Sequence, residues 1–284
     1  MPHMLGPDDL VLCSGTLRRA SLAEKCAAAV AGGFGALTLW PEDVARARSE
    51  GLALADVRRL ITDHGLEVAD LDPLLRWLPD EVIPPGIPAA TEGEFYAIAD
   101  GVGARSLNVA QGFGARVDVD RAAEALAGVC DRAREHGLLV TLEYLPWSGI
   151  PDARTALAIV ERAGRANATL MIDTWHSFRG ATDGAQLEAL PGARVGSVQL
   201  NDAPAQPAAN LVTETLEARL LPGEGAIPIV RWLRILDRIG SRAPLGVEVF
   251  SRALDALPPV EVGRRCGAAA RTVIAAARGA QSPV

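Results

Sequence analysis

Short apolar runs alternate with longer amphipathic segments along the whole 284-residue chain. A strand buried on both faces of a parallel sheet is typically a short, continuous apolar run, whereas a connecting helix carries one apolar face. Eight runs fit strands: Leu10–Cys13, Ala36–Leu39, Glu67–Leu71, Ser106–Val109, Leu139–Glu143, Leu170–Asp173, Val195–Leu200 and Leu245–Val249. Eight segments fit helices: Ser21–Ala31, Leu54–Asp63, Thr91–Gly101, Val119–His136, Asp152–Ala163, Gln186–Leu190, Ile227–Ile239 and Val260–Ala277. This order predicts repeated βα units, and hence an α/β chain with a parallel sheet.

Two architectures are built from repeated βα units, a closed barrel and an open doubly wound sheet. The open sheet usually has a glycine-rich phosphate-binding turn after its first strand, and Cys13-Ser14-Gly15-Thr16 is too short to form one. Eight units suit a single (β/α)8 barrel, which we predict as one domain over residues 1–284. Residues 202–226 are rich in Pro, Ala and Gly, and they predict a long inserted loop after the seventh strand.

The composition is that of an ordinary globular chain with a sizeable core, 49% hydrophobic and 22% charged. A net charge of -7 gives no electrostatic reason to expect nucleic acid or an anionic membrane as a partner. The cysteines are widely scattered, and residues 1–4 lack the charged and apolar pattern of a secretory signal. We therefore expect a reduced, cytoplasmic protein that acts on a small molecule. Whether it forms a homo-oligomer is left open.

Four residues with side-chain oxygens stand at the ends of the last four predicted strands: Glu143, Asp173, Gln199 and Glu248. The intervals between them are 30, 26 and 49 residues, and one unit of a (β/α)8 barrel takes roughly 31. The third interval holds one unit plus the inserted loop. One acid at a strand end is commonly a helix cap, but four ligands at one barrel mouth favour a metal site. Three carboxylates and an amide oxygen suit Mg²⁺ or Mn²⁺ better than Zn²⁺ or Co²⁺, so we predict one divalent ion.

Five motifs surround these positions: Glu143-Tyr144, Asp173-Thr174-Trp175-His176, Gln199-Leu200-Asn201-Asp202, Pro222-Gly223-Glu224-Gly225 and Glu248. In order and register they resemble the xylose-isomerase-like TIM barrels, also called the sugar phosphate isomerase/epimerase superfamily. The resemblance spans nearly the whole chain. It is specific for the superfamily and only a weak indicator of the reaction. It implies a TIM-barrel enzyme in which the four strand-end residues bind one divalent ion.

The resemblance also implies roles for individual residues. Glu143 and Glu248 would flank the substrate and move protons, and His176 would bond a substrate oxygen. Arg219 would meet a substrate hydroxyl, carboxylate or phosphate, and Asn108 is expected among the substrate contacts.

Two positions depart from many members of the superfamily, which have His where this chain has Gln199 and Lys where it has Asn201. Gln at this ligand position is similar to hydroxypyruvate isomerases and to bacterial 3-dehydroshikimate dehydratases. DNA-repair endonucleases of the superfamily need a histidine-rich trinuclear zinc site. The four histidines of this chain cannot build one, because His64 and His136 precede glycines at predicted helix ends.

Four tryptophans follow predicted strands on the face where barrel active sites lie: Trp40, Trp77, Trp147 and Trp175. We predict that they contact the substrate, which would then carry a ring or a partly apolar body. The competing interpretation is that they cover the barrel mouth or form an oligomer interface.

Lys25 is the only lysine, and every other basic side chain apart from histidine is arginine. Schiff-base chemistry would have to use this residue, which we expect on the solvated face of the predicted helix Ser21–Ala31.

The reactions open to such a site share one difficult step, the removal of a weakly acidic proton next to a carbonyl group. Returning the proton gives an isomer or an epimer, whereas expelling a β-hydroxyl gives a dehydrated product. We predict a metal-dependent isomerase or epimerase of a hydroxy-carbonyl compound. The alternatives are a metal-dependent dehydratase of a 3-dehydroshikimate-like keto acid, and an inactive barrel that serves as a partner subunit.

Overall fold

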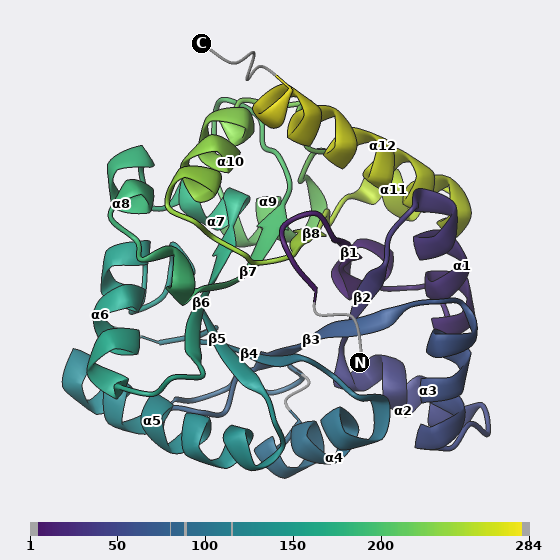
Figure 1. Ribbon diagram of the computed structural model, residues 1–284, viewed down its shortest axis with the longest axis horizontal. Coiled ribbons are helices and arrows are strands. Elements are labelled where there is room, and N and C mark those ends of the chain that lie inside the picture. The colour runs from purple at the N-terminus through teal and green to yellow at the C-terminus, as the bar shows by residue number, and fades with distance from the viewer. Residues whose placement is uncertain (1–4, 80, 88–89, 115, 280–284) are drawn as a thin grey trace.

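The computed structural model describes residues 5–79, 81–87, 90–114 and 116–279. Eight parallel strands pair in chain order and close into a barrel through β1 and β8 (Figure 1). The strands are β1 (Leu10–Leu12), β2 (Ala36–Leu39), β3 (Glu67–Leu74), β4 (Ser106–Ala110), β5 (Leu139–Glu143), β6 (Ala168–Asp173), β7 (Val195–Leu200) and β8 (Leu245–Val247). Each overlaps a predicted strand, and the prediction of a (β/α)8 TIM barrel is confirmed.

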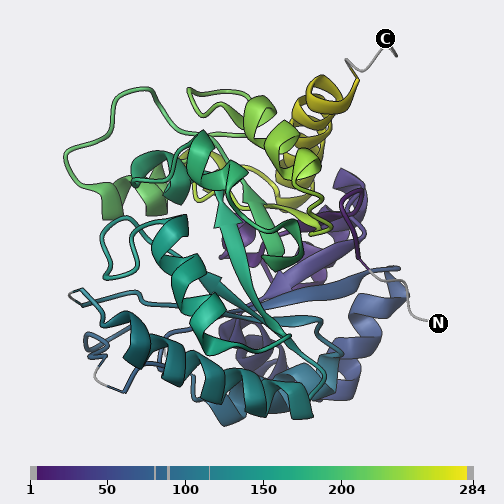
Figure 2. The ribbon, with the colours of Figure 1, turned by 60° about the vertical axis from the view of Figure 1, so that its left-hand side comes forward.

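Helices surround the barrel, most of them on its outside (Figures 1 and 2). They are α1 (Leu22–Gly32), α2 (Pro41–Ser49), α3 (Leu54–Asp63), α4 (Glu92–Val102), α5 (Val119–Glu135), α6 (Ala153–Ala163), α7 (Thr174–Arg179), α8 (Gly184–Glu188), α9 (Leu211–Glu217), α10 (Ile229–Arg238), α11 (Arg252–Asp255) and α12 (Pro259–Arg278). Short 3₁₀ helices lie at Ser14–Leu17 and Gly192–Arg194.

Four helices were not predicted, namely α2, α7, α9 and α11. The last three have 6, 7 and 4 residues, which is too short for a helical period to show in the sequence. Four of the nine residues of α2 are charged, and the helix buries only Asp43, Val44 and Ala47. Residues 202–226 were predicted to form one long loop. This prediction is wrong in one respect, because α9 lies within the segment.

Local signals explain where several helices begin and end. Ser21 and Glu24 form a capping box at the start of α1, and Gly33 ends it in the left-handed conformation with φ 72°. His64 and His136 are the C-terminal caps of α3 and α5, so their interpretation as helix ends is confirmed.

The first and last long helices, α1 and α12, lie side by side (Figure 1). Glycines allow their backbones to touch: a Cβ atom on Gly263 would lie 2.1 Å from the Ala28 carbonyl oxygen, and one on Gly267 would lie 2.0 Å from that of Gly32. None of the helices in the described ranges is long and apolar enough to cross a membrane.

Lys25 is buried, contrary to the prediction of a solvated position. Its side chain is 3% exposed, and Nζ donates to Asp43 Oδ1 of α2 at 2.6 Å. Nζ also donates to Ser14 Oγ, just after β1, at 2.5 Å. Ser14 Oγ in turn donates to Asp43. Lys25 therefore joins three segments of the fold through a buried ion pair.

Candidate metal and substrate site

The last four strands bring the four predicted ligands to one end of the barrel. Glu143 and Asp173 are the final residues of β5 and β6, Gln199 is the next-to-last residue of β7, and Glu248 directly follows β8. Asp173 and Gln199 are paired in register between neighbouring strands. All four residues are buried, with exposed fractions between 1% and 7%.

Oxygen atoms of three of these residues converge with no hydrogen between them. The amide oxygen of Gln199 lies 3.2 Å from Asp173 Oδ2 and 3.3 Å from Glu248 Oε2. Without a cation, the amide gains by turning over, because its NH₂ group then donates to both carboxylates. The Gln199 side chain can therefore offer either its oxygen to a cation or its NH₂ group to the two carboxylates.

His176 extends the donor set. One atom each of Glu143, Asp173 and His176 lies within 4.8 Å of the other two. His176 Nε2 is 3.5 Å from Glu143 Oε1. These three residues could hold a divalent ion. Gln199 lies against both Asp173 and Glu248, and so links Glu248 to the same cluster. His176, predicted as a substrate contact, thus lies among the possible ligands.

Arg219 supplies a positive charge to the cluster. Its buried Nη1 donates to Asp173 Oδ2 at 2.9 Å and to Glu248 Oε2 at 3.3 Å. Its Nη2 donates to Thr215 Oγ1 of α9 at 2.7 Å and lies 3.3 Å from His176 Nε2. The carboxylates of Glu143, Asp173 and Glu248 together with this guanidinium leave two negative charges when all are ionised. A divalent cation would neutralise them, so the residues present fit such an ion.

Burial shifts the acid–base properties of the cluster. It raises the pKa of Glu143 to about 8, with repulsion from Glu248 and Asp173 in the same direction. It raises the pKa of Glu248 to about 7 against the opposing effect of Arg219. Burial alone would also raise the pKa of Asp173, but Arg219 and His176 outweigh it and hold that pKa below its usual value. Burial lowers the pKa of His176 to about 3, so its ring is neutral.

The metal-free protein is expected to lose stability as the pH rises from about 5 to about 8. In this interval the folded state keeps Glu143 and Glu248 protonated, whereas the unfolded chain has ionised both above their ordinary pKa of 4.5. Their contribution is fully present below that pKa and is lost as the pH rises through about 7 and 8. Because a cation binds the ionised carboxylates, its stabilising effect should be larger at pH 8 than at pH 6.

Thermal unfolding of EDTA-treated protein at pH 6 and pH 8, with and without added Mn²⁺, measures how Tm depends on pH and on the metal. The double variant Glu143→Gln/Glu248→Gln is the control, and its Tm should lose both the pH dependence and the metal dependence. An equal rise in Tm on adding Mn²⁺ at the two pH values would contradict the assignment of these carboxylates to a metal site.

Two of the sequence motifs position the site. Asp202 accepts hydrogen bonds at Oδ2 from the backbone of Gly223 (3.0 Å) and Gly225 (2.9 Å). A Cβ atom on Gly225 would lie 2.3 Å from a carbonyl oxygen, so this turn has no room for a side chain. Asn201 Nδ2 donates to Asp173 Oδ2 at 2.8 Å. These contacts hold the segment that carries Arg219 beside the end of β6.

A cavity of about 150 Å³ opens over the cluster. Its polar lining includes Glu143, Gln199, Glu248, His176, Arg219 and Asn108. Asn108 Nδ2 donates to Glu143 Oε2 at 2.8 Å, which orients that carboxyl. Asp173 lies behind the lining.

The predicted tryptophans divide into two pairs. Trp40 and Trp147 line the cavity, together with Phe250. Trp77 and Trp175 do not, contrary to their prediction as substrate contacts. Trp77 is buried and donates to the Ala110 carbonyl oxygen at 3.1 Å, and Trp175 is fully buried and donates to Glu214 at 3.1 Å. Position after a strand does not decide the matter, because the rings of Trp77 and Trp175 pack into the hydrophobic core.

Asp72 also lines the cavity and was not predicted. The predicted third strand stopped at Leu71, whereas β3 continues to Leu74. The alternation of Asp70 and Asp72 with apolar neighbours was the signal, since every second residue of a strand faces the same side.

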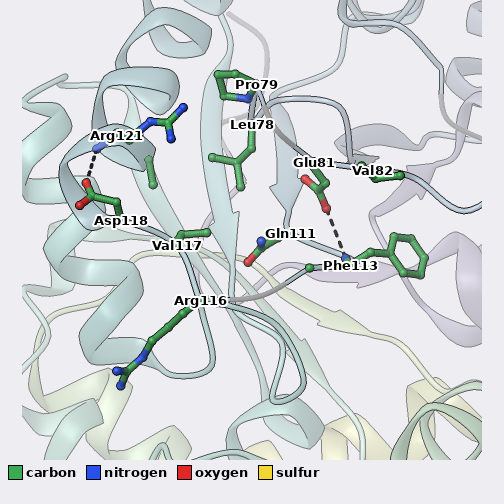
Figure 3. A pocket seen from close by; sticks show the side chains of 12 residues that line it. Leu78, Pro79, Glu81, Val82, Gln111, Phe113, Arg116, Val117, Asp118 and Arg121 are labelled. Carbon is green, nitrogen blue, oxygen red and sulfur yellow. Dashed lines mark hydrogen bonds between the residues drawn. The ribbon is translucent and has the colours of Figure 1, made fainter.

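A second cavity of about 330 Å³ lies outside the cluster, between the segment after β3 and the start of α5 (Figure 3). Its lining includes Leu78, Glu81, Gln111, Phe113 and Val117, and none of the four predicted ligands. Burial raises the pKa of Glu81 to about 7, and Glu81 Oε1 accepts a hydrogen bond from Phe113 N. The smaller cavity holds the converging donors, so we assign the chemistry there.

The sequence matches the family described as xylose isomerase-like TIM barrel over residues 26–268. The chain belongs to this family. The predicted resemblance is therefore confirmed.

Curated relatives differ in their named activities. A 3-dehydroshikimate dehydratase from Pseudomonas aeruginosa is 27% identical over 241 residues, which make up 84% of this chain and 37% of that protein. An inosose isomerase from Bacillus velezensis is 29% identical over 130 residues, 45% of each chain. This chain spans less than half the length of these curated relatives.

A solved structure supports the fold. The IolI protein with a bound zinc atom superposes with a TM-score of 0.82 at 18% identity, covering 94% of this chain and 98% of that one. At this level of identity the similarity concerns the architecture alone.

Proposed function

We propose that this chain is a divalent-metal-dependent isomerase or epimerase, which moves a proton next to the carbonyl group of a hydroxy-carbonyl substrate. The pairing of Glu143 and Glu248 carries the proposal. These buried carboxyls stand at the end of β5 and directly after β8, and both line one cavity. A carboxylate beside the substrate can accept a proton and return it. An inactive barrel would have gaps in this set.

Mg²⁺ or Mn²⁺ best matches the oxygen donors, and His176 beside them would also admit Zn²⁺ or Co²⁺. Glu143, Asp173, Gln199 and Glu248 would hold the ion, with His176 close by. When bound, the ion draws negative charge from the substrate carbonyl oxygen and lowers the cost of removing the neighbouring proton.

Side chains of the protein transfer the proton and orient the reacting groups. One of the carboxyls Glu143 and Glu248 takes the proton from the carbon next to the carbonyl group. Return to the adjacent carbon gives an isomer, and return to the opposite face gives an epimer. Arg219 can only donate hydrogen bonds, so its contact with His176 Nε2 at 3.3 Å requires that ring nitrogen to be unprotonated. Arg219 and Asn108 orient the carboxyls through their hydrogen bonds.

A dehydratase is the second candidate function. The similarity to a 3-dehydroshikimate dehydratase extends over 84% of this chain. The aromatic lining by Trp40, Trp147 and Phe250 also suits a ring-bearing substrate. Elimination would begin with the same proton removal and then expel a β-hydroxyl group.

Deuterium uptake and the identity of the product distinguish the isomerase or epimerase from the dehydratase. Metal-loaded protein is incubated in D₂O with 3-dehydroshikimate, an inosose or a free ketose. We expect deuterium in the recovered or isomerised form of at least one compound, and none after treatment with EDTA. A new ultraviolet-absorbing enone or catechol would favour the dehydratase. The absence of exchange and of product with Mg²⁺, Mn²⁺, Co²⁺ and Zn²⁺ would contradict both functions.

A further inference from the structure

Asp72 is a buried carboxyl whose oxygens have no hydrogen-bond partner among the described residues. It lies near the carboxyl end of β3, is 3% exposed and lines the cavity over the metal cluster. Buried polar side chains in folded proteins almost always have a partner, because an unsatisfied one forfeits its hydration. The partner of Asp72 must therefore come from outside the described chain.

Asp70 provides the comparison within the same strand. It lies two residues earlier on the same inward side of β3 and is also buried. Its carboxylate accepts hydrogen bonds from Ser197 Oγ at 2.8 and 2.9 Å and from Ser106 Oγ. The barrel thus supplies partners to an interior aspartate that serves the fold, and it supplies none to Asp72.

Asp72 faces the cavity in which a substrate would bind. The predicted metal ligands come from β5 to β8, whereas β3 lies between β2 and β4 in the closed barrel. Asp72 lines the same cavity as three of these ligands, Glu143, Gln199 and Glu248. A molecule held by the metal cluster would therefore present another part of itself to Asp72.

We propose that Asp72 is a specificity-determining residue that hydrogen-bonds a hydroxyl group of a polyhydroxylated substrate, on the part that does not bind the metal. This inference rests on the proposed function and deepens it. A hydroxyl group can donate to a carboxylate or accept from a carboxylic acid, so the contact forms in either protonation state of Asp72. The substrate class is a cyclic polyol ketone or a ketose with a free hydroxyl group remote from its carbonyl.

The charges around Asp72 favour a neutral partner. Glu248, Asp70, Glu143 and Asp43 all add repulsion to the effect of burial, and the pKa of Asp72 is raised well above its ordinary value. An anionic substrate group at this position would lie buried among carboxyl groups, which disfavours a further negative charge. A carboxylate or phosphate on the substrate is thus directed away from Asp72, and Arg219 is the cation that lines the same cavity.

The variants Asp72→Leu and Asp72→Asn test this role by two independent measurements. The test uses a panel of three compounds: 3-dehydroshikimate, an inosose and a free ketose. Substrate affinity and kcat/KM are measured with the panel compound that wild-type protein converts best, and with its analogue lacking one remote hydroxyl. Asp72→Leu should lower kcat/KM by at least about tenfold, mainly through KM, and should nearly abolish the preference for the hydroxylated compound. Asp72→Asn, whose amide still bonds a hydroxyl, should lose less.

Thermal stability separates this role from a structural one. Replacing an unpartnered buried carboxyl should raise the Tm of the substrate-free protein by about 2–4 °C in Asp72→Leu. The matched control Asp70→Asn removes a partnered carboxylate, so it should lower Tm while leaving KM within about twofold. A structural Asp72 would instead lower Tm when it is replaced.

Two results would overturn the inference. One is an Asp72→Leu protein whose kcat/KM and hydroxyl preference stay within twofold of wild type. The other is a fall in Tm as large as that of Asp70→Asn. If wild-type protein binds and converts no panel compound with any metal, the proposed function fails, and the Tm comparison still decides whether Asp72 is structural.

Discussion

Replacing Glu248 with Gln is expected to lower kcat/KM by about a thousandfold on whichever hydroxy-carbonyl compound the wild-type protein converts. The amide has the size of the carboxyl but cannot accept the substrate proton. It also removes the charge that faces Arg219 Nη1 at 3.3 Å. The fold should survive, because burial raises the pKa of Glu248 to about 7 and the metal-free protein already tolerates its neutral form. Steady-state kinetics and deuterium uptake from D₂O measure the loss.

The exposed residue Glu224 offers a matched control. Glu224→Gln changes the net charge equally, and this residue does not line the cavity. Its kcat/KM should stay within about twofold of wild type. A Glu248→Gln protein that keeps more than a tenth of wild-type activity while holding its metal would exclude Glu248 from proton transfer.

Replacing Lys25 with Met is expected to lower the free energy of unfolding by about 3–5 kcal/mol. Met fills much of the same volume, but Asp43 then keeps a buried carboxylate without its cation at 2.6 Å. Ser14 Oγ also loses its contact with Nζ at 2.5 Å. Urea unfolding followed by circular dichroism measures the change.

The exposed pair Arg59 and Asp56 is the control for Lys25. Arg59 Nη2 lies 2.7 Å from Asp56 Oδ1, but its side chain is 67% exposed. Arg59→Met should therefore cost no more than about 0.5 kcal/mol. The double variant Lys25→Met/Asp43→Leu should recover part of the stability lost in Lys25→Met. Equal losses for Lys25→Met and Arg59→Met would show that the buried pair does not stabilise the fold.

The strands and long helices could be predicted because their signals are local. Ala36–Leu39 and Val195–Leu200 are short segments with apolar residues at most positions, and each was predicted with the bounds that the structure has. Helix α9 was missed because a helix of 7 residues inside a Pro- and Ala-rich segment shows no clear period. Its tertiary contacts stabilise it instead: Glu214 accepts a hydrogen bond from Arg179 Nε at 2.6 Å.

The candidate site could be predicted in part for the same reason. Glu143, Asp173, Gln199 and Glu248 end apolar runs, and the end of a parallel strand has one possible location in a barrel. The direction of a loop side chain has no such local signal. Trp40 and Trp147 line the cavity, whereas Trp77 and Trp175 are packed in the core.

The sequence by itself determined the barrel, its family and the oxygen donors at its mouth, because strand periodicity and strand-end position are properties of short segments. Only the tertiary structure decided which side chains have partners. Arg219 pairs with Asp173 across 46 residues, and Ser197 pairs with Asp70 across 127. Such contacts depend on how distant segments pack, so no local pattern shows them. Asp70 has partners on β4 and β7, whereas Asp72 has none among the described residues and lines the cavity, which relates it to the substrate.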